Sequence, residues 1–123
     1  MKEKVFTPEE HVRRAQIAAM ALGLIHALES GVLDTETPQK LLFRPGIFEK
    51  YKDDPEIYRL LNLGEELCWT VWKTLPEFRE ESVYEIKELC LKILSQESEV
   101  IRNDLLKKTT PSKRVRRDRS DQK

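Results

Sequence analysis

The feature that most constrains this chain is a segment near its start whose apolar residues surround a helix on almost every side. The segment begins with Thr7, Pro8 and Glu10, which match an N-cap, a first-turn proline and a capping box, and it ends at Gly31, a typical helix stop. Between them, residues 17–28 are apolar nearly all round and rich in alanine. Such a helix belongs in the middle of a bundle. We therefore predict a buried, Ala-rich first helix.

Prolines divide the rest of the chain into shorter helical pieces. Helix starts are predicted at Thr37-Pro38, Asp54-Pro55 and Pro76, and a break at Arg44-Pro45-Gly46. No segment alternates apolar and polar residues with the period of a half-buried strand. The sequence predicts an all-α fold, a compact single-domain bundle of five to seven helices over residues 1–108. Two points stay open: whether Gly64 kinks or ends its helix, and whether residues 96–108 extend the preceding helix or form a last one capped by Ser98.

The charge of the chain is distributed unevenly, although its net charge is zero. Residues 107–123 hold eight Lys and Arg against two Asp, a net charge of +6, so the remainder carries −6. Because residues 109–123 are almost free of apolar side chains, they are predicted to form a disordered basic tail. Five of its cations would suit phosphate contacts with a nucleic acid: Lys113, Arg114, Arg116, Arg117 and Arg119. A solvated end, a protein or membrane-surface contact, and a contact with the acidic body are the alternatives.

Residues that could support catalysis or bind a metal are few. His11, His26, Cys68 and Cys90 lack the close pairs that structural zinc sites use. No P-loop, dinucleotide-binding or EF-hand motif is present. We expect no enzyme activity, no cofactor and no metal, with His26 as a hydrogen-bonded core residue. The longest apolar run has nine residues, too few to cross a membrane. With both cysteines at apolar helical positions, reduced thiols and a cytoplasmic location are expected.

A cluster of aromatic and acidic residues is the strongest candidate for a binding surface. Two tryptophans three residues apart share one face of a helix, where they would be either core residues or anchors for a partner. The acidic residues around them would suit a basic protein partner. The predicted partner-binding residues are Glu65, Glu66, Trp69, Trp72, Glu77, Glu80 and Glu81. A small-molecule site between helices near His26 is a third hypothesis, and a homodimer is left open.

Part of the chain resembles a known family of proteins. Residues 22–67 contain Leu-Glu-x-Gly followed by a hydrophobic residue, an acidic helix start, Leu-Phe-x-Pro and a later Leu-Gly. The matching residues are Leu28, Glu29, Gly31, Val32, Leu42, Phe43, Pro45, Leu63, Gly64 and Glu66. The pattern is similar to that of a family of small uncharacterised bacterial proteins, a domain of unknown function. The resemblance implies an all-helical fold and a bacterial or phage source, and it transfers no catalytic site.

These features together favour binding over catalysis. The sequence predicts a small non-catalytic bacterial or phage protein-interaction module, of regulatory or immunity type, that uses its acidic, aromatic-bearing surface. The alternative is a nucleic-acid-associated protein that uses the basic tail as a phosphate-binding arm.

Overall fold

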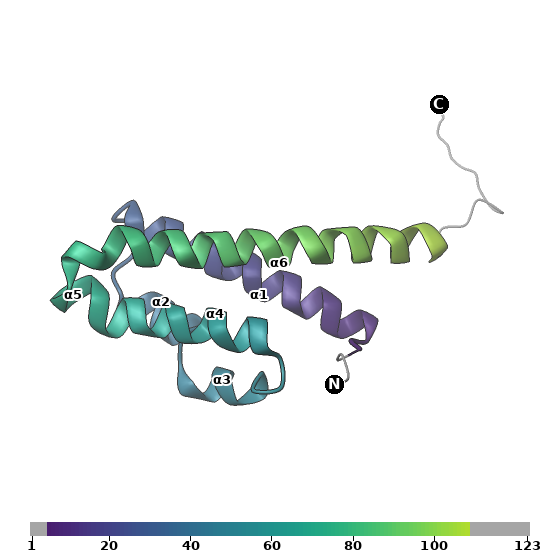
Figure 1. Cartoon of the computed structure of the whole chain (residues 1–123), viewed down its shortest axis with the longest axis horizontal. Coiled ribbons are helices and arrows are strands. Elements are labelled where there is room, and N and C mark those ends of the chain that lie inside the picture. Colours follow the sequence, from purple (N-terminus) through teal and green to yellow (C-terminus); the bar gives the residue numbers. More distant parts are fainter. Residues whose placement is uncertain (1–4, 109–123) are drawn as a thin grey trace, which may run out of the picture.

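The computed structural model describes residues 5–108, and these residues form helices without a strand, which confirms the all-α prediction. Two long helices, α1 (Pro8–Glu29) and α6 (Arg79–Lys108), run antiparallel against each other. A third rod lies beside them and consists of α4 (Pro55–Glu66), the π-helical segment η1 (Leu67–Val71) and α5 (Trp72–Thr74). As Figure 1 shows, α6 extends over the length of both neighbours.

Three short segments complete the fold. The helices α2 (Glu36–Leu41) and α3 (Pro45–Lys50) have six residues each, and a 3₁₀ turn, η2 (Pro76–Phe78), leads into α6. The predicted count of five to seven helices differs from this arrangement. Because η1 and α5 continue α4 without interruption, these three segments form one rod instead of separate helices.

Local sequence signals set most helix boundaries. The Thr7 backbone N–H donates to Glu10 Oε1 at 2.8 Å, and the Glu10 N–H donates to Thr7 Oγ1 at 3.1 Å, so the predicted capping box forms. Asp54 caps α4 through the N–H of Ile57 at 3.3 Å. Gly31 follows the end of α1 with a φ of 78°, a conformation that glycine adopts at little cost.

Three boundaries sharpen or correct the predictions. α2 begins at Glu36, ahead of the predicted Thr37-Pro38 start, because the Asp34 carboxylate accepts from the backbone N–H groups of Glu36 and Thr37. α6 continues past Ser98, so residues 96–108 extend it. Gly64 does not end its helix, since α4 continues beyond it into η1.

Close packing in the core explains why residue 64 is a glycine, since the glycine neither ends nor caps its helix. A Cβ atom at this position would collide with the ring of Phe43, which is fully buried. The glycine therefore gives α4 room to lie directly on the segment between α2 and α3. Phe43 and Gly64 both belong to the sequence pattern on which the family resemblance rests. Part of that pattern is therefore explained by a packing contact in the core.

The first helix is buried on one side only, which corrects the prediction of a helix surrounded by protein. Its core face is lined by Arg14, Ile17, Ala18, Ala21, Leu24, Ile25 and Leu28. On the opposite side, Val12 is 42% and Met20 47% exposed. His26 is exposed too, so it is neither a core residue nor part of a site between helices.

Two further predictions concern the basic tail and the ability of the chain to cross a membrane. The basic tail, residues 109–123, lies outside the described residues, as do its five candidate nucleic-acid contacts. Within residues 5–108, no helix has the length and apolar character that crossing a membrane requires.

Candidate functional site

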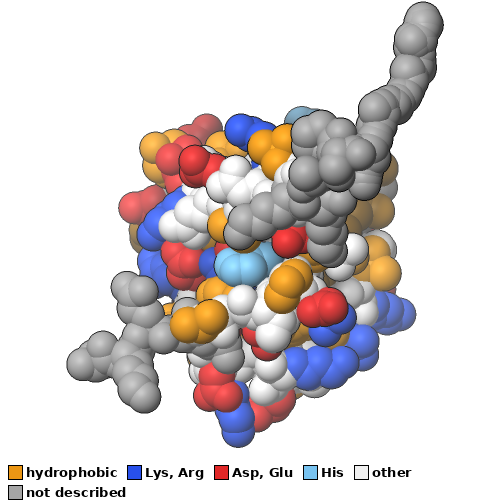
Figure 2. All heavy atoms as spheres, turned by 90° about the vertical axis from the view of Figure 1, so that its right-hand side faces the viewer, with side chains coloured by type: hydrophobic (Ala, Val, Ile, Leu, Met, Phe, Trp, Pro, Cys, Tyr) orange, Lys and Arg blue, Asp and Glu red, His pale blue; other side chains and the backbone are white. Residues whose placement is uncertain are grey.

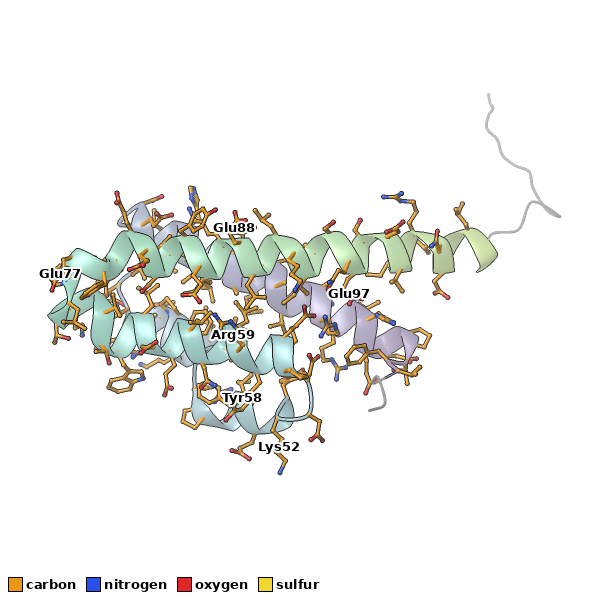
Figure 3. All side chains as sticks on the ribbon, in the orientation of Figure 1. Lys52, Tyr58, Arg59, Glu77, Glu88 and Glu97 are labelled. Carbon is orange, nitrogen blue, oxygen red and sulfur yellow. The ribbon has the colours of Figure 1, made fainter. Side chains whose placement is uncertain are left out.

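The residues of the predicted partner-binding surface come from five consecutive segments. Glu65 and Glu66 end α4, Trp69 lies in η1, and Trp72 begins α5. The other three lie where the chain turns back into α6: Glu77 in η2, followed by Glu80 and Glu81 in the first turn of α6. Figure 3 shows Glu77 at that end of the molecule.

The structure separates the two tryptophans. The side chain of Trp69 is 63% exposed, whereas Trp72 is half-buried and packs against the hydrophobic core. An α-helix would place residues three apart on one face, but a π-helical turn is wider. Because η1 ends between these two residues, Trp69 points to solvent while Trp72 faces the protein. The prediction of one shared face is therefore wrong.

A polar contact fixes the exposed tryptophan on one edge. The indole Nε1 of Trp69 donates to the side-chain oxygen of Gln39 over 2.9 Å, with the Gln39 amide turned so that its nitrogen donates to the Thr35 carbonyl over 3.2 Å. Most of the indole ring remains in contact with solvent. Trp69 is therefore oriented by the protein although the core does not cover it.

Trp69 forms one end of an open groove of about 900 Å³ along the outer side of α4. The groove is lined by Lys52, Pro55, Tyr58, Arg59, Asn62, Leu63, Glu65, Glu66, Trp69 and Thr70. Three of the seven predicted residues, Glu65, Glu66 and Trp69, thus share one surface, whereas Trp72, Glu77, Glu80 and Glu81 do not line it. We call this surface the α4 groove.

The charge of the α4 groove is mixed, which differs from the purely acidic rim that was predicted. Lys52 and Arg59 line it together with Glu65 and Glu66. Figure 3 shows that Arg59 points toward α6, where its guanidinium forms an exposed ion pair with Glu85. Tyr58 points toward α3, and its ring meets Phe48 edge to face with 6.1 Å between centroids. The acidic groups therefore gather at the Trp69 end.

Trp72 has a structural role. The guanidinium of Arg79 lies over its ring, 4.4 Å from the centroid, and Arg79 Nε donates to the Trp72 carbonyl oxygen at 2.7 Å. This pair of contacts joins the end of the rod to the start of α6. The turn between the two helices is fixed by Trp72 and Arg79, which leaves Trp69 as the exposed tryptophan of the predicted surface.

A second cluster, which the sequence did not predict, lies inside the bundle at the start of α1. The side chain of Arg14 is only 4% exposed and donates to carboxylates from two other helices and a helix cap. Its Nη1 contacts both oxygens of Asp54 at 2.6 Å, its Nη2 contacts Glu56 at 2.7 Å, and its Nε contacts Glu97 at 2.9 Å. We call these four residues the Arg14 cluster.

His11 and Phe6 complete the Arg14 cluster toward solvent. Nδ1 of His11 donates to the second oxygen of Glu97 at 2.5 Å, so the carboxylate fixes which ring nitrogen carries the proton. The ring of Phe6 lies 4.6 Å from the Arg14 guanidinium and meets His11 edge to face at 5.4 Å. Figure 2 views this end of the molecule, where a histidine lies amid hydrophobic and charged side chains.

In the Arg14 cluster one guanidinium contacts three carboxylates, and each charge has a partner of opposite sign. Burial lowers the pKa of Arg14, but its hydrogen bonds to Asp54, Glu97 and Glu56 outweigh that effect and raise the pKa above the ordinary value. Burial alone would raise the pKa of Glu56, because it disfavours the charged carboxylate. The hydrogen bonds to Arg14 and Lys92 outweigh this effect, so the pKa of Glu56 is lowered. Since every buried charge has a partner of opposite sign, the cluster fixes α1, α4 and α6 to one another.

The remaining candidate residues are not brought together. Cys68 and Cys90 are buried free thiols, and burial raises the pKa of each to about 12, so neither is a thiolate at neutral pH. Among the described residues, no group of three or more His, Cys, Asp and Glu is placed to hold a metal ion.

Comparison with family models gives a match over most of the chain. A family model described as a protein of unknown function (DUF3969) matches residues 9–107, a range that contains the stretch that carried the resemblance. No curated protein and no solved structure matches the chain.

Proposed function

The chain belongs to the DUF3969 family of proteins of unknown function, and we propose that it is a small non-catalytic protein-interaction module that binds a basic protein through the α4 groove. In this proposal the protein acts in the cytoplasm of a bacterial or phage-infected cell, in a regulatory or immunity role. Two buried free thiols support a reducing compartment.

The observation that carries the proposal is the exposure of Trp69. Tryptophan is mostly buried in folded proteins, and where it is exposed beside a groove it is a frequent source of binding energy. Trp69 is 63% exposed, is oriented by Gln39 and lies on a π-helical turn, a distortion often found at functional sites. An anchor of this kind is partly ordered before a partner arrives, which lowers the entropy lost on binding.

The charge next to Trp69 supports a basic partner. Glu65 and Glu66 lie in the α4 groove, and Glu77, Glu80 and Glu81 carry further negative charge at the nearby turn into α6. Of the two cations in the groove, Arg59 is already paired with Glu85. Acidic groups around an aromatic anchor raise the association rate of a basic partner and discriminate against acidic ones.

The proposal can be tested by placing a photo-crosslinking amino acid at position 69 of the full chain. A matched variant carries it at Leu106, which is 63% exposed but lies at the far end of α6 from the turn that follows the groove. In cells of the source organism we expect one dominant, basic protein to be crosslinked from position 69 and not from position 106. Equal crosslinking from both positions would contradict the proposal.

Affinity measurements with the purified crosslinked protein then test the roles of the side chains. Trp69→Ala should weaken binding about tenfold or more, as is typical of an anchor residue, whereas Leu106→Ala should leave it unchanged. Glu65→Gln combined with Glu66→Gln should slow association more than Glu88→Gln with Glu99→Gln, which removes the same charge elsewhere. If Trp69→Ala binds as tightly as the unaltered chain, the α4 groove is not the binding surface.

The second candidate function rests on the charge of the C-terminal residues. Residues 107–123 carry a net charge of +6, which suits a phosphate-binding arm that includes Lys113, Arg114, Arg116, Arg117 and Arg119. Binding of mixed-sequence DNA and RNA by the full chain should then exceed that of a chain ending at Lys108, and should persist at physiological salt. Equal binding by both chains would exclude the arm.

A further inference from the structure

Over residues 15–28 the outer face of α1 stands out among the exposed helix faces of the described residues in its lack of charge. Residues 15–28 contain no Lys, Arg, Asp or Glu, although these make up 36% of the chain. The exposed residues of α1 within this range are Gln16, Ala19, Met20, Gly23 and His26. By contrast, the exposed positions of α6 include Glu88, Lys92 and Glu99, and those of α4 include Arg59 and Glu66.

An uncharged face of this length needs an explanation, because nothing within the described chain covers it. α1 packs against α6 and α4 on its opposite side. Its outer face over residues 15–28 therefore leaves Met20 at 47% exposure, and on the neighbouring helix α6 Leu91 is 50% exposed. A helix that is apolar all round is ordinarily covered by protein on every side.

We propose that the outer face of α1 binds the same face of a second copy of this chain, giving a symmetric dimer with antiparallel α1 helices. The absence of charge on this face favours a second copy of the chain over a charged partner. A basic or acidic partner would gain no ion pair here, whereas a second uncharged face can be covered without desolvating any charge. Small side chains at every fourth position, namely Ala15, Ala19, Gly23 and Ala27, allow the two backbones to approach closely.

The spacing of residues along α1 also fits such a pairing. With the two-fold axis at the level of Ala21, Ala19 lies at the level of the partner's Gly23, so the smallest side chains meet. The same register brings Gln16 to the level of the partner's His26, and these are the polar residues of the face. In this arrangement the polar residues lie toward the two ends of the contact and the smallest side chains lie at its centre.

The neighbouring helix contributes at the same position. α1 and α6 are joined by the Arg14–Glu97 contact near one end and by the Glu29–Lys87 ion pair near the other. The residues of α6 at the level of Ala21 are therefore those around Leu91. An exposed leucine beside the two-fold axis would add apolar area to the centre of the interface.

The test is the mass of the full chain in solution, measured by sedimentation velocity over a micromolar to millimolar concentration series. Each chain has a mass of 14.5 kDa, and we expect twice that value for the unaltered protein. Gly23→Arg should give a monomer. Its side chain has room in the single chain, since a Cβ at this position meets nothing within 4 Å, and arginine favours a helix more than glycine does.

The matched control is Gln96→Arg, which adds the same charge to an exposed position of α6 outside the proposed interface. It should remain a dimer, and circular dichroism should find all three proteins equally helical. A monomeric unaltered chain, a dimeric Gly23→Arg variant, or loss of the dimer in Gln96→Arg would each overturn the proposal. No residue of α1 lines the α4 groove, so either surface can fail its test without affecting the other.

Discussion

At the start of α1, charged side chains lie inside the protein, whereas along α4 a tryptophan lies outside it. Arg14, Asp54 and Glu97 are each less than a tenth exposed, and every one of them is held by ionic hydrogen bonds. Trp69, an apolar residue, is 63% exposed and has one polar contact on its edge. Charged residues are usually exposed and tryptophan is usually buried, so both regions are exceptions to the usual distribution.

The difference between the two regions shows which of them is built for stability. Buried charges that have all their partners join elements without presenting anything to a ligand. An exposed aromatic residue beside a groove does the reverse, since its surface is covered only when something binds. Substitutions in the Arg14 cluster should therefore change the free energy of unfolding, and substitutions at Trp69 should change binding.

The largest effect is expected from Arg14→Met. This change removes the cation and leaves the carboxylates of Asp54 and Glu97 buried without it, which should lower the free energy of unfolding by about 3 to 5 kcal/mol. Urea denaturation followed by circular dichroism measures the loss. The matched change Arg59→Met breaks the exposed pair with Glu85 and should cost about 1 kcal/mol or less. Equal losses in the two variants would contradict the distinction between the regions.

Gly64 tests how tightly the core is packed beneath the α4 groove. Gly64→Ala places a methyl group against the buried ring of Phe43, and overpacking of this kind should cost about 3 kcal/mol in unfolding free energy. Within a single chain the same substitution at Gly23 meets no neighbour, and at concentrations low enough for a monomer it should stabilise α1 by about 1 kcal/mol, because alanine favours a helix. Thermal unfolding of both variants checks the difference in sign.

The two tryptophans provide a comparison within the groove region itself. Trp72→Ala removes a half-buried ring and its contact with Arg79, and should lower the free energy of unfolding by about 2 kcal/mol. Trp69→Ala removes mostly solvent-exposed surface and should cost roughly 0.5 kcal/mol or less. Chemical denaturation measures the loss of unfolding free energy in each variant. A loss at Trp69 as large as that at Trp72 would make Trp69 a structural residue.

Local signals in the sequence predicted much of the fold. Caps and prolines act within one helical turn, so Thr7 and Asp54 could be assigned without knowledge of the tertiary structure, although Pro45, predicted as part of a break, begins α3. The π-helical turn could not be assigned in this way, because it breaks the period from which the shared face of Trp69 and Trp72 was inferred. The orientation of His26 was also missed, since a helix that is apolar all round gives no polar face to orient it.

The Arg14 cluster was missed for a different reason. Arg14 does carry a local signal, since it lies three and four residues before Ile17 and Ala18, on the buried side of α1. Its partners, however, are 40 to 83 residues away in the chain, on elements whose packing one sequence does not determine. The many acidic residues of α6 offered no reason to select Glu97 from among them.

The smallest expected effect concerns Glu56, the carboxylate of the Arg14 cluster nearest to solvent. Burial raises the pKa of Glu56, but its bonds to Arg14 and to Lys92, 3.3 Å away, lower the pKa below its ordinary value of 4.5 in the folded protein. The unfolded chain therefore takes up the proton first as the pH falls. The stabilisation from Glu56 is complete above pH 4.5 and is lost as the pH falls through the lower pKa of the folded state.

This dependence can be isolated with Glu56→Gln, which keeps the shape of the side chain and removes its titration. At neutral pH the variant should be less stable by about 1 kcal/mol, because the side chain of Glu56 is 31% exposed and solvent weakens its ion pairs. Below pH 4.5 the difference between the two proteins should shrink as the pH falls. A difference that stays constant from pH 7 to pH 3 would mean that Arg14 does not hold Glu56 ionised. The buried carboxylates Asp54 and Glu97 would then account alone for the stability of the Arg14 cluster.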